Sequence, residues 1–122
     1  MVIDRRPDPL DLVPLKPLET LVMTMLASGD RHGYGIRQEI LTHTGGRLAV
    51  EAGNLYRHIR RLESVGAIEE SGRRRAKDGD DERRIYYRLT GFGRRLLATE
   101  MLRMRALVRL AEAHRIITPE PA

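Results

Sequence analysis

The segment AGNLYRHIRRLESVG, residues 52–66, decides how the rest of the chain is interpreted. Leu55, Ile59 and Leu62 recur at intervals of four and three residues, and a helix with about 100° between successive residues places them on one side. The opposite side carries an amide and three positive charges, on Asn54, Arg57, Arg60 and Arg61. The pattern predicts an amphipathic helix from about Ala52 to Val65, with an apolar stripe facing a core and a basic face directed outward.

Two shorter helices are predicted on the N-terminal side of this segment. The first begins at Pro17, because the missing N–H of proline would be unpaired at a first helical position anyway. Its apolar residues recur at helical intervals and are Leu18, Leu21, Val22, Met25 and Leu26. The second helix is expected from Ile36 to about Thr44, with Gly45–Gly46 as its stop signal. We expect His32 to cap this second helix and Tyr34, which stands between two glycines, to pack against the protein.

Three short stretches are predicted to be strands. Arg47–Val50 precedes the basic helix, Ala67–Glu69 follows it, and residues 85–89 alternate in the manner of a strand. In this last stretch one side consists of Ile85, Tyr87 and Leu89 and the other of Tyr86 and Arg88. Residues 72–84 are polar and contain Asp78-Gly79, a favourable turn, so the last two strands should form a hairpin. Only one limb of the hairpin tip, Arg73–Lys77, is predominantly basic.

A long helix is predicted from about Gly91 to Arg115. Its main apolar stripe has near-helical spacing and consists of Phe92, Leu96, Met101, Met104, Val108 and Ala111. Further leucines widen this stripe beyond one face: Leu97, Leu102, Leu107 and Leu110. So much apolar surface exceeds what one small domain can cover, and pairing with a second copy would bury it. We therefore predict a homodimer whose interface contains the six residues of the main stripe.

The order of these elements predicts an α+β fold, mainly α with a small β-hairpin. Three short helices followed by a basic hairpin form the layout of a winged helix-turn-helix, here followed by a long C-terminal dimerisation helix. A flexible, extended N-terminal arm is expected over residues 1–15, where three prolines disfavour a helix. We expect the winged domain over residues 16–90, the dimerisation helix over residues 91–117 and a frayed tail over residues 118–122.

The composition excludes several classes of protein. The 122 residues fit one domain, and the absence of cysteine rules out disulfides and cysteine-based catalytic or metal sites. The four histidines stand far apart, and no catalytic constellation or cofactor-binding motif stands out, so we predict no enzyme, no metal and no cofactor. No apolar stretch is long enough to span a membrane and the N-terminus lacks a signal-peptide core, so we expect a cytoplasmic protein.

The charge distribution points to DNA. Basic residues outnumber acidic ones by 22 to 17, and all but Lys16 and Lys77 are arginine, which suits phosphate recognition, although genome base composition explains the excess equally well. In a winged helix-turn-helix the third helix enters the major groove, where arginine binds guanine and asparagine binds adenine. Tyr56 lies at the core boundary and either packs there or offers its hydroxyl to a phosphate. The predicted DNA-binding residues are Asn54, Tyr56, Arg57, Arg60, Arg61, Arg73, Arg74 and Arg75.

Three motifs occur in order along the chain: HGYGI at residues 32–36, GNLYRHIRRLE at 53–63 and RIYYRLTGFGRR at 84–95. They resemble signatures of the PadR family of bacterial transcriptional regulators, and the resemblance covers about Leu18 to Ala111. It implies a dimer joined through its C-terminal helices, a palindromic operator, usually repression and, in some members, a small aromatic effector. The single C-terminal helix is similar to the shorter-tailed branch of the family.

One position departs from the family pattern. The family commonly has Ser-Pro immediately before the glycine that opens the third helix, where this chain has Glu51-Ala52. Glutamate is a weaker N-cap than serine, and its charge would stand near the expected path of the phosphates. We therefore expect the usual cap to be lost.

Two other functions are compatible with parts of the sequence. A winged-helix adaptor would use the long C-terminal helix to bind a different protein, and the sequence does not separate this function from a repressor. A basic RNA-binding module would stack bases on exposed aromatic rings. The chain has one Phe and four Tyr, and Phe92 and Tyr87 fall on apolar stripes, so this second alternative is weak.

Overall fold

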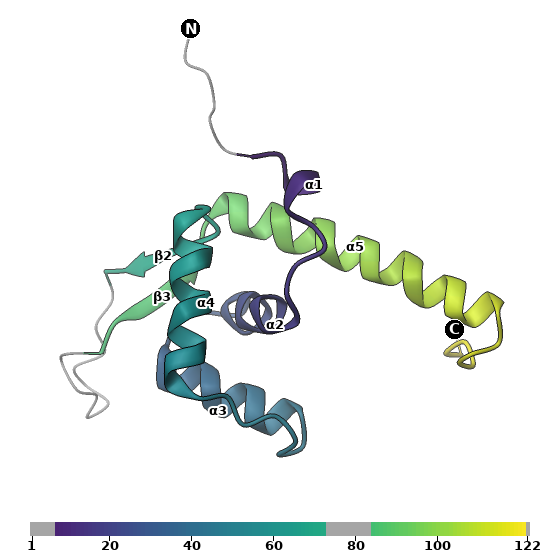
Figure 1. The fold of residues 1–122 in the computed structure, drawn as a ribbon, viewed down its shortest axis with the longest axis horizontal. Coiled ribbons are helices and arrows are strands. Elements are labelled where there is room, and N and C mark those ends of the chain that lie inside the picture. The colour runs from purple at the N-terminus through teal and green to yellow at the C-terminus, as the bar shows by residue number, and fades with distance from the viewer. Residues whose placement is uncertain (1–6, 73–83, 122) are drawn as a thin grey trace, which may run out of the picture.

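Figure 1 shows the fold in a computed structural model, which describes residues 7–72 and 84–121. The elements follow in the order α1 (Pro9–Leu12), α2 (Pro17–Leu26), β1 (Arg31–His32), α3 (Gly33–His43), α4 (Ala52–Ser64), β2 (Ile68–Ser71), β3 (Tyr86–Leu89) and α5 (Gly91–Ala113). Helices α2, α3 and α4 pack together beside the sheet, and the second half of α5 extends away from them. The predicted α+β fold, with a small hairpin and a long last helix, is confirmed.

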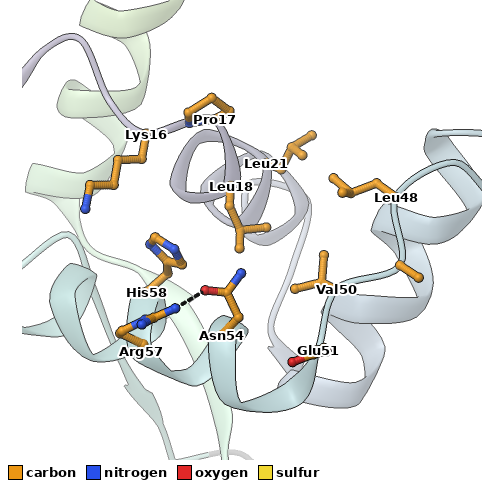
Figure 2. A pocket seen from close by; sticks show the side chains of 11 residues that line it. Lys16, Pro17, Leu18, Leu21, Leu48, Val50, Glu51, Asn54, Arg57 and His58 are labelled. Atoms are coloured by element: carbon orange, nitrogen blue, oxygen red, sulfur yellow. Dashed lines mark hydrogen bonds between the residues drawn. The ribbon is translucent and has the colours of Figure 1, made fainter.

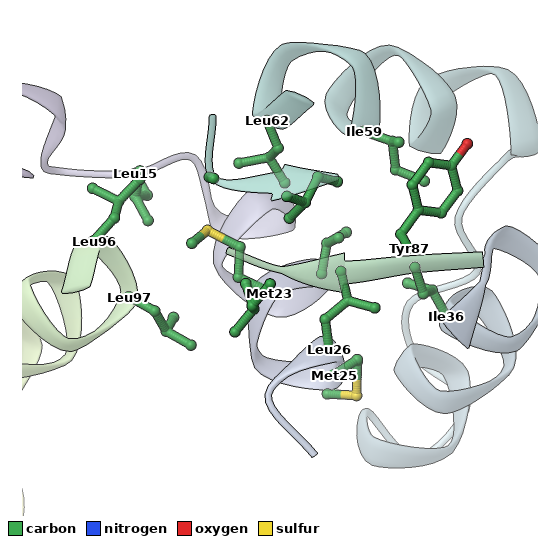
Figure 3. Packing of buried hydrophobic residues seen from close by; sticks show 14 of the residues in the cluster. Leu15, Met23, Met25, Leu26, Ile36, Ile59, Leu62, Tyr87, Leu96 and Leu97 are labelled. Carbon is green, nitrogen blue, oxygen red and sulfur yellow. The ribbon is translucent and has the colours of Figure 1, made fainter. Parts of the chain in front are cut away.

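The core lies where α2, α3, α4, the sheet and the first half of α5 meet (Figure 3). The predicted stripe of α4 is confirmed, because Leu55, Ile59 and Leu62 are all buried. On α2 the prediction needs correction, since Leu18 and Leu21 are only half-buried. The reason is that α5 and β3 also pack against α2. The buried face of α2 therefore includes Met23, which is fully buried.

The sheet has three antiparallel strands in the order β1-β3-β2. The predicted hairpin is confirmed by the pairing of β2 with β3, in which Ile68 lies opposite Leu89. Its tip, with the predicted turn at Asp78-Gly79, lies outside the described residues. Strand β1 was not predicted, because two residues are too short for a periodic signal.

Three details of the predicted strands are wrong. Ile85, predicted on the inner side of the last strand, precedes β3 and is exposed. Arg47–Val50 has no regular structure, because Val50 is buried and its carbonyl accepts a hydrogen bond from Nε of Arg37, at 2.8 Å, in place of a strand partner. Tyr86, predicted on the outer side of its strand, is buried. Strand β1 pairs beside it, and the ring of His32 meets the ring of Tyr86 edge-on at 5.1 Å.

The N-terminal segment is not extended throughout, as its prolines predicted. Residues Pro9–Leu12 form α1, which lies against α5 (Figure 1). Asp8 caps this short helix by accepting a hydrogen bond from the backbone N–H of Leu10, at 3.0 Å. Proline is compatible with this helix because Pro9 occupies its first position, where no N–H is required.

A buried carboxylate joins the N-terminal segment to α5. Glu100 is only 1% exposed, and its Oε2 accepts a hydrogen bond from the backbone N–H of Leu15 at 2.8 Å. Arg103 donates to both carboxylate oxygens, at 2.5 Å and 3.2 Å. The hydrogen bond from Arg103 and the backbone N–H of Leu15 lower the pKa of Glu100, against an opposing effect of burial.

Replacing Glu100 by glutamine should therefore destabilise the fold in a pH-dependent way. At neutral pH we expect a loss of about 1–3 kcal/mol of unfolding free energy, the usual contribution of a hydrogen-bonded buried charge. Because the folded-state pKa lies below the ordinary value of 4.5, the advantage of the wild type is fully present above that value. It is lost as the pH falls through the folded-state pKa. Urea unfolding of both proteins across this range measures the effect, and a constant difference at every pH would contradict it.

The first half of α5 belongs to the core of its own chain. Phe92 and Leu96 are 2% and 0% exposed, so their assignment to a dimer interface was wrong. They are already covered by the winged part of the same protomer. Beyond Glu100 the apolar side chains of α5 are uncovered, with Met101, Met104 and Val108 between 38% and 46% exposed. Among the described residues, no helix is long and apolar enough to cross a membrane.

The start of α5 approaches the backbone before β2 very closely at Gly93. The carbonyl oxygen of Ala67 accepts a hydrogen bond from the backbone N–H of Thr90 at 3.1 Å. The Thr90 hydroxyl, which donates to the carbonyl of Gly66 at 2.5 Å, lies 3.1 Å from the same oxygen. A Cβ atom on Gly93 would lie 1.9 Å from this oxygen. The contact between α5 and the sheet thus depends on the absence of a side chain at this position.

Candidate nucleic-acid interface

Helix α4 presents its basic face to solvent, as predicted. Arg57, Arg60 and Arg61 are exposed, and Asn54 is half-buried at the first turn. The N-cap residue Glu51 makes no side-chain hydrogen bond to the helix, which confirms the expected loss of the cap. The structure therefore gathers four of the predicted DNA-binding residues on one face of α4. The other predicted basic contacts, Arg73, Arg74 and Arg75, lie outside the described residues.

Asn54 and Arg57 are coupled on this face. Nη2 of Arg57 donates a hydrogen bond to Oδ1 of Asn54, at 2.5 Å, as Figure 2 shows. The bond occupies the acceptor of the amide and leaves its N–H groups, with the remaining N–H groups of the guanidinium, as donors toward solvent. Such a pair can donate to base edges or to phosphate oxygens.

A buried glutamate on α2 binds two side chains of α4. Glu19 is 1% exposed and accepts hydrogen bonds from Nδ1 of His58, at 2.7 Å, and from Nε of Arg61, at 3.2 Å. Arg61 therefore reaches the surface already bound through one of its nitrogens. This contact was missed, although the helical projection of α2 places Glu19 beside Val22 and Leu26, both of which are buried.

A pocket of about 730 Å³ lies beside the first turns of α4 (Figure 2). One wall is apolar and consists of Pro17, Leu18, Leu21, Leu48, Ala49 and Val50. The other wall is polar and consists of Lys16, Glu51, Asn54, Arg57 and His58. The volume falls in the range of small-molecule sites, and its lining suits an apolar molecule with an anionic group. The pocket shares Asn54 and Arg57 with the basic face.

A second, smaller pocket of about 230 Å³ lies on the other side of α4. It is lined by His32, Gly33, Tyr34, Tyr56, Arg84, Ile85 and Tyr87. Tyr34 is 53% exposed, so its predicted role as a packed residue was wrong. Its ring contacts only side chains near the surface of the pocket: the ring of His32 stacks beside it at 6.3 Å and the guanidinium of Arg84 lies 5.6 Å from its centre. Burial, followed by the nearby charge of Glu63, raises the pKa of Tyr87 to about 12.

Residues 7–72 and 84–121 bring together no group of three histidine, aspartate or glutamate side chains that could hold a metal ion.

Comparisons with known proteins agree with this geometry. The model of the transcriptional regulator PadR-like family matches residues 22–99. An uncharacterised protein X from Lysinibacillus sphaericus is 31% identical over 81 residues, which cover 66% of this chain and 72% of that protein.

Two solved structures illustrate the similarity of fold. A transcriptional regulator from Clostridium thermocellum superposes with a TM-score of 0.66 at 25% identity, over 79% of this chain and 87% of that one. PadR of Bacillus subtilis, solved in complex with operator DNA, superposes with a TM-score of 0.59 at 20% identity. The second match covers 70% of this chain and 47% of that one, and at this identity it shows the fold alone.

Proposed function

We propose that this chain, which belongs to the transcriptional regulator PadR-like family, is a repressor that binds a palindromic operator as a homodimer. The observation that carries the proposal is the exposed face of α4, where Asn54 and three arginines stand opposite a fully buried apolar stripe. In this proposal residues 16–90 form the DNA-binding domain and residues 91–117 the dimerisation helix.

Each part of the winged domain has a role in this proposal. Helix α4 enters the major groove, where Asn54 and the arginines donate to base edges and phosphates. The wing, by which we mean strands β2 and β3 and the residues between them, follows the DNA backbone. Arg73, Arg74 and Arg75 are proposed to contact phosphates there, which would add affinity for any sequence.

The uncovered second half of α5 supports the proposed dimer. Met101, Met104, Val108 and Ala111 are proposed to form the interface, because the first three are exposed and Ala111 is partly exposed in the single chain. A two-fold dimer presents two copies of α4. The preferred operator should therefore be a palindrome, and the spacing between its two half-sites should equal the distance between the two α4 helices.

A small aromatic effector, as the family resemblance implies, is also part of the proposal. The pocket of about 730 Å³ beside α4 offers an apolar wall for a ring and Lys16 for an acidic group. A molecule bound there would contact Asn54 and Arg57, which are proposed to face DNA. Effector and operator would then exclude each other.

A gel-shift with the DNA upstream of the protein's own gene tests the proposed function. Retardation at low salt that survives an excess of random-sequence competitor supports a sequence-specific regulator. The absence of any retardation at low salt would overturn it and favour an adaptor, in which the exposed apolar side chains of α5 bind a different protein.

Arg57→Ala should weaken operator binding by about 1–3 kcal/mol and relax the sequence preference, if Arg57 forms a bidentate contact with guanine. Binding to the operator and to random DNA is measured for wild type and variant. Arg95→Ala is the matched control, because Arg95 is also exposed but lies on α5, away from α4. An equal loss of affinity for both DNAs would show that Arg57 contacts phosphate and not a base.

A further inference from the structure

Three side chains that carry hydrogen-bond donors line the polar wall of the pocket of about 730 Å³. Lys16 stands immediately before α2, whereas Asn54 and Arg57 lie in the first turns of α4. We call these three residues the flank cluster, because they lie at the flank of α4 beside the start of α2. Figure 2 shows Lys16 and Arg57 on the same side of the pocket, across from Leu48 and Val50. The fold thus adds a lysine from the start of another helix to the basic face of α4.

The flank cluster carries two positive charges that no carboxylate in the described part of the chain neutralises by an ion pair. Lys16 and Arg57 are both exposed, and the guanidinium of Arg57 donates to an amide oxygen, Oδ1 of Asn54. The ammonium of Lys16 makes no hydrogen bond or ion pair with any described residue. The acidic residue of the pocket lining is Glu51, which makes no side-chain hydrogen bond to α4. Positive charge therefore exceeds negative charge along this lining, which favours the approach of an anion.

A second acid, the buried Glu19 of α2, does not compete for Lys16. Its Oε2 accepts a hydrogen bond from Nδ1 of His58, at 2.7 Å, and its Oε1 accepts one from Nε of Arg61, at 3.2 Å. Both carboxylate oxygens are thus bound to side chains of α4, and only 1% of this residue is exposed. The ammonium of Lys16 is therefore available to an anion that is not part of the chain.

The position of the flank cluster indicates which anion this is. The major groove is bounded by two phosphate backbones, so a helix inside the groove has one backbone on each side. Figure 1 shows the sheet and α2 on opposite sides of α4. In the proposed function the wing follows one backbone, and the other backbone therefore runs along the side of α4 on which α2 begins. Lys16 stands on that side, and lysine binds phosphate as a compact point charge.

We propose that Lys16 binds a phosphate of the DNA backbone that runs along the α2 side of α4. Its ammonium supplies the charge, and an N–H of Asn54 donates to the same phosphate, since Arg57 already occupies the Oδ1 acceptor of that amide. This inference rests on the proposed function and adds to it a residue outside the predicted DNA-binding set. It also names the group for which DNA and effector would compete, because the same ammonium is proposed to hold the acidic group of an effector.

Binding to a random-sequence duplex, measured by fluorescence anisotropy at several salt concentrations, tests the proposal without knowledge of the operator. Each phosphate contact contributes about 0.9 to the slope of log affinity against log salt. In a dimer with two copies of Lys16, Lys16→Ala should therefore reduce the slope by about 2 and weaken binding at low salt by about tenfold or more. Lys16→Arg keeps the charge and should retain the slope.

Arg95→Ala is the matched control for the loss of one positive charge per chain. Arg95 is exposed on α5, away from α4, so its loss should leave the slope unchanged. Glu51→Gln tests the same pocket lining with the opposite sign, because it removes a negative charge. A phosphate backbone that passes here would be repelled less, so this variant should bind the random duplex a few-fold more tightly. Thermal melting followed by circular dichroism checks that each variant is folded.

The outcomes separate this inference from the proposed function. If the wild type does not bind duplex DNA at low salt, the proposed function fails. If the wild type binds and folded Lys16→Ala keeps its slope, Lys16 does not contact a phosphate and this inference alone is overturned. The same conclusion follows if Arg95→Ala reduces the slope as much as Lys16→Ala, or if Glu51→Gln binds no more tightly than the wild type.

Discussion

Replacing Gly93 by alanine should destabilise the protein by about 3 kcal/mol or more, the upper range for overpacking a core. The new methyl group would stand 1.9 Å from the carbonyl oxygen of Ala67. That oxygen cannot move away cheaply, because it accepts a hydrogen bond from the backbone N–H of Thr90 and belongs to the backbone that leads into β2. The strain has to be relieved by shifting α5 off the sheet, which uncovers Phe92 and Leu96. Urea unfolding followed by circular dichroism gives the change in free energy.

Gly91→Ala is the control for this substitution. Gly91 lies in the same first turn of α5, is exposed, and would place its Cβ near only the guanidinium of Arg95, at 3.8 Å. Alanine is a better helix former than glycine, so this variant should be neutral or stabilised by about 0.5–1 kcal/mol. A Gly93→Ala variant as stable as Gly91→Ala would refute the close approach of α5 to Ala67.

The second large effect is expected on self-association. Met104→Glu combined with Val108→Glu places four carboxylates in the proposed interface, where each would be buried without a partner. We expect the dissociation constant of the dimer to rise at least about a hundredfold, or about 3 kcal/mol. Both side chains are exposed in the single chain, at 40% and 46%, so the fold of the protomer should survive. Size-exclusion chromatography with light scattering gives the mass of each species.

Arg109→Glu serves as the comparison, because it changes the net charge per chain by the same amount as the double variant. Arg109 is exposed on α5 and projects to a different side from Met104 and Val108. This variant should remain dimeric. A monomeric wild type at micromolar concentration, or a double variant that stays dimeric, would contradict the proposed interface.

Those parts of the fold that depend on repeated apolar spacing could be predicted from the sequence. The stripe of α4 repeats over two turns, and the helix boundary at Pro17 carries a local signal that context did not override. Strand β1 has two residues and no period, so only its partner β3 reveals it. Val50 was assigned to a strand because an apolar residue in the sequence indicates burial, and buried residues occur in irregular segments as well as in strands.

The site was predictable as a face but not as a set of contacts. Periodicity placed Arg57 and Arg61 on the outside of α4, yet it could not indicate that Glu19, 42 residues away, accepts a hydrogen bond from Arg61. Phe92 and Leu96 were assigned to the wrong interface for a related reason. A stripe along one helix does not tell where the protein's own core ends and an uncovered surface begins.

The carboxylate of Glu19 also bears on how strictly α4 can choose among sequences. An arginine free to rotate can reach either of two neighbouring bases, and it surrenders much of its rotational freedom when it does so. Arg61 is held at Nε, and His58 is held by the other oxygen of the same carboxylate, so both have lost that freedom before any partner arrives. The entropic cost of ordering them is met during folding. In the proposed function, an arginine whose rotation is restricted in this way adapts poorly to a mismatched base pair, so the buried glutamate should make α4 more selective among DNA sequences.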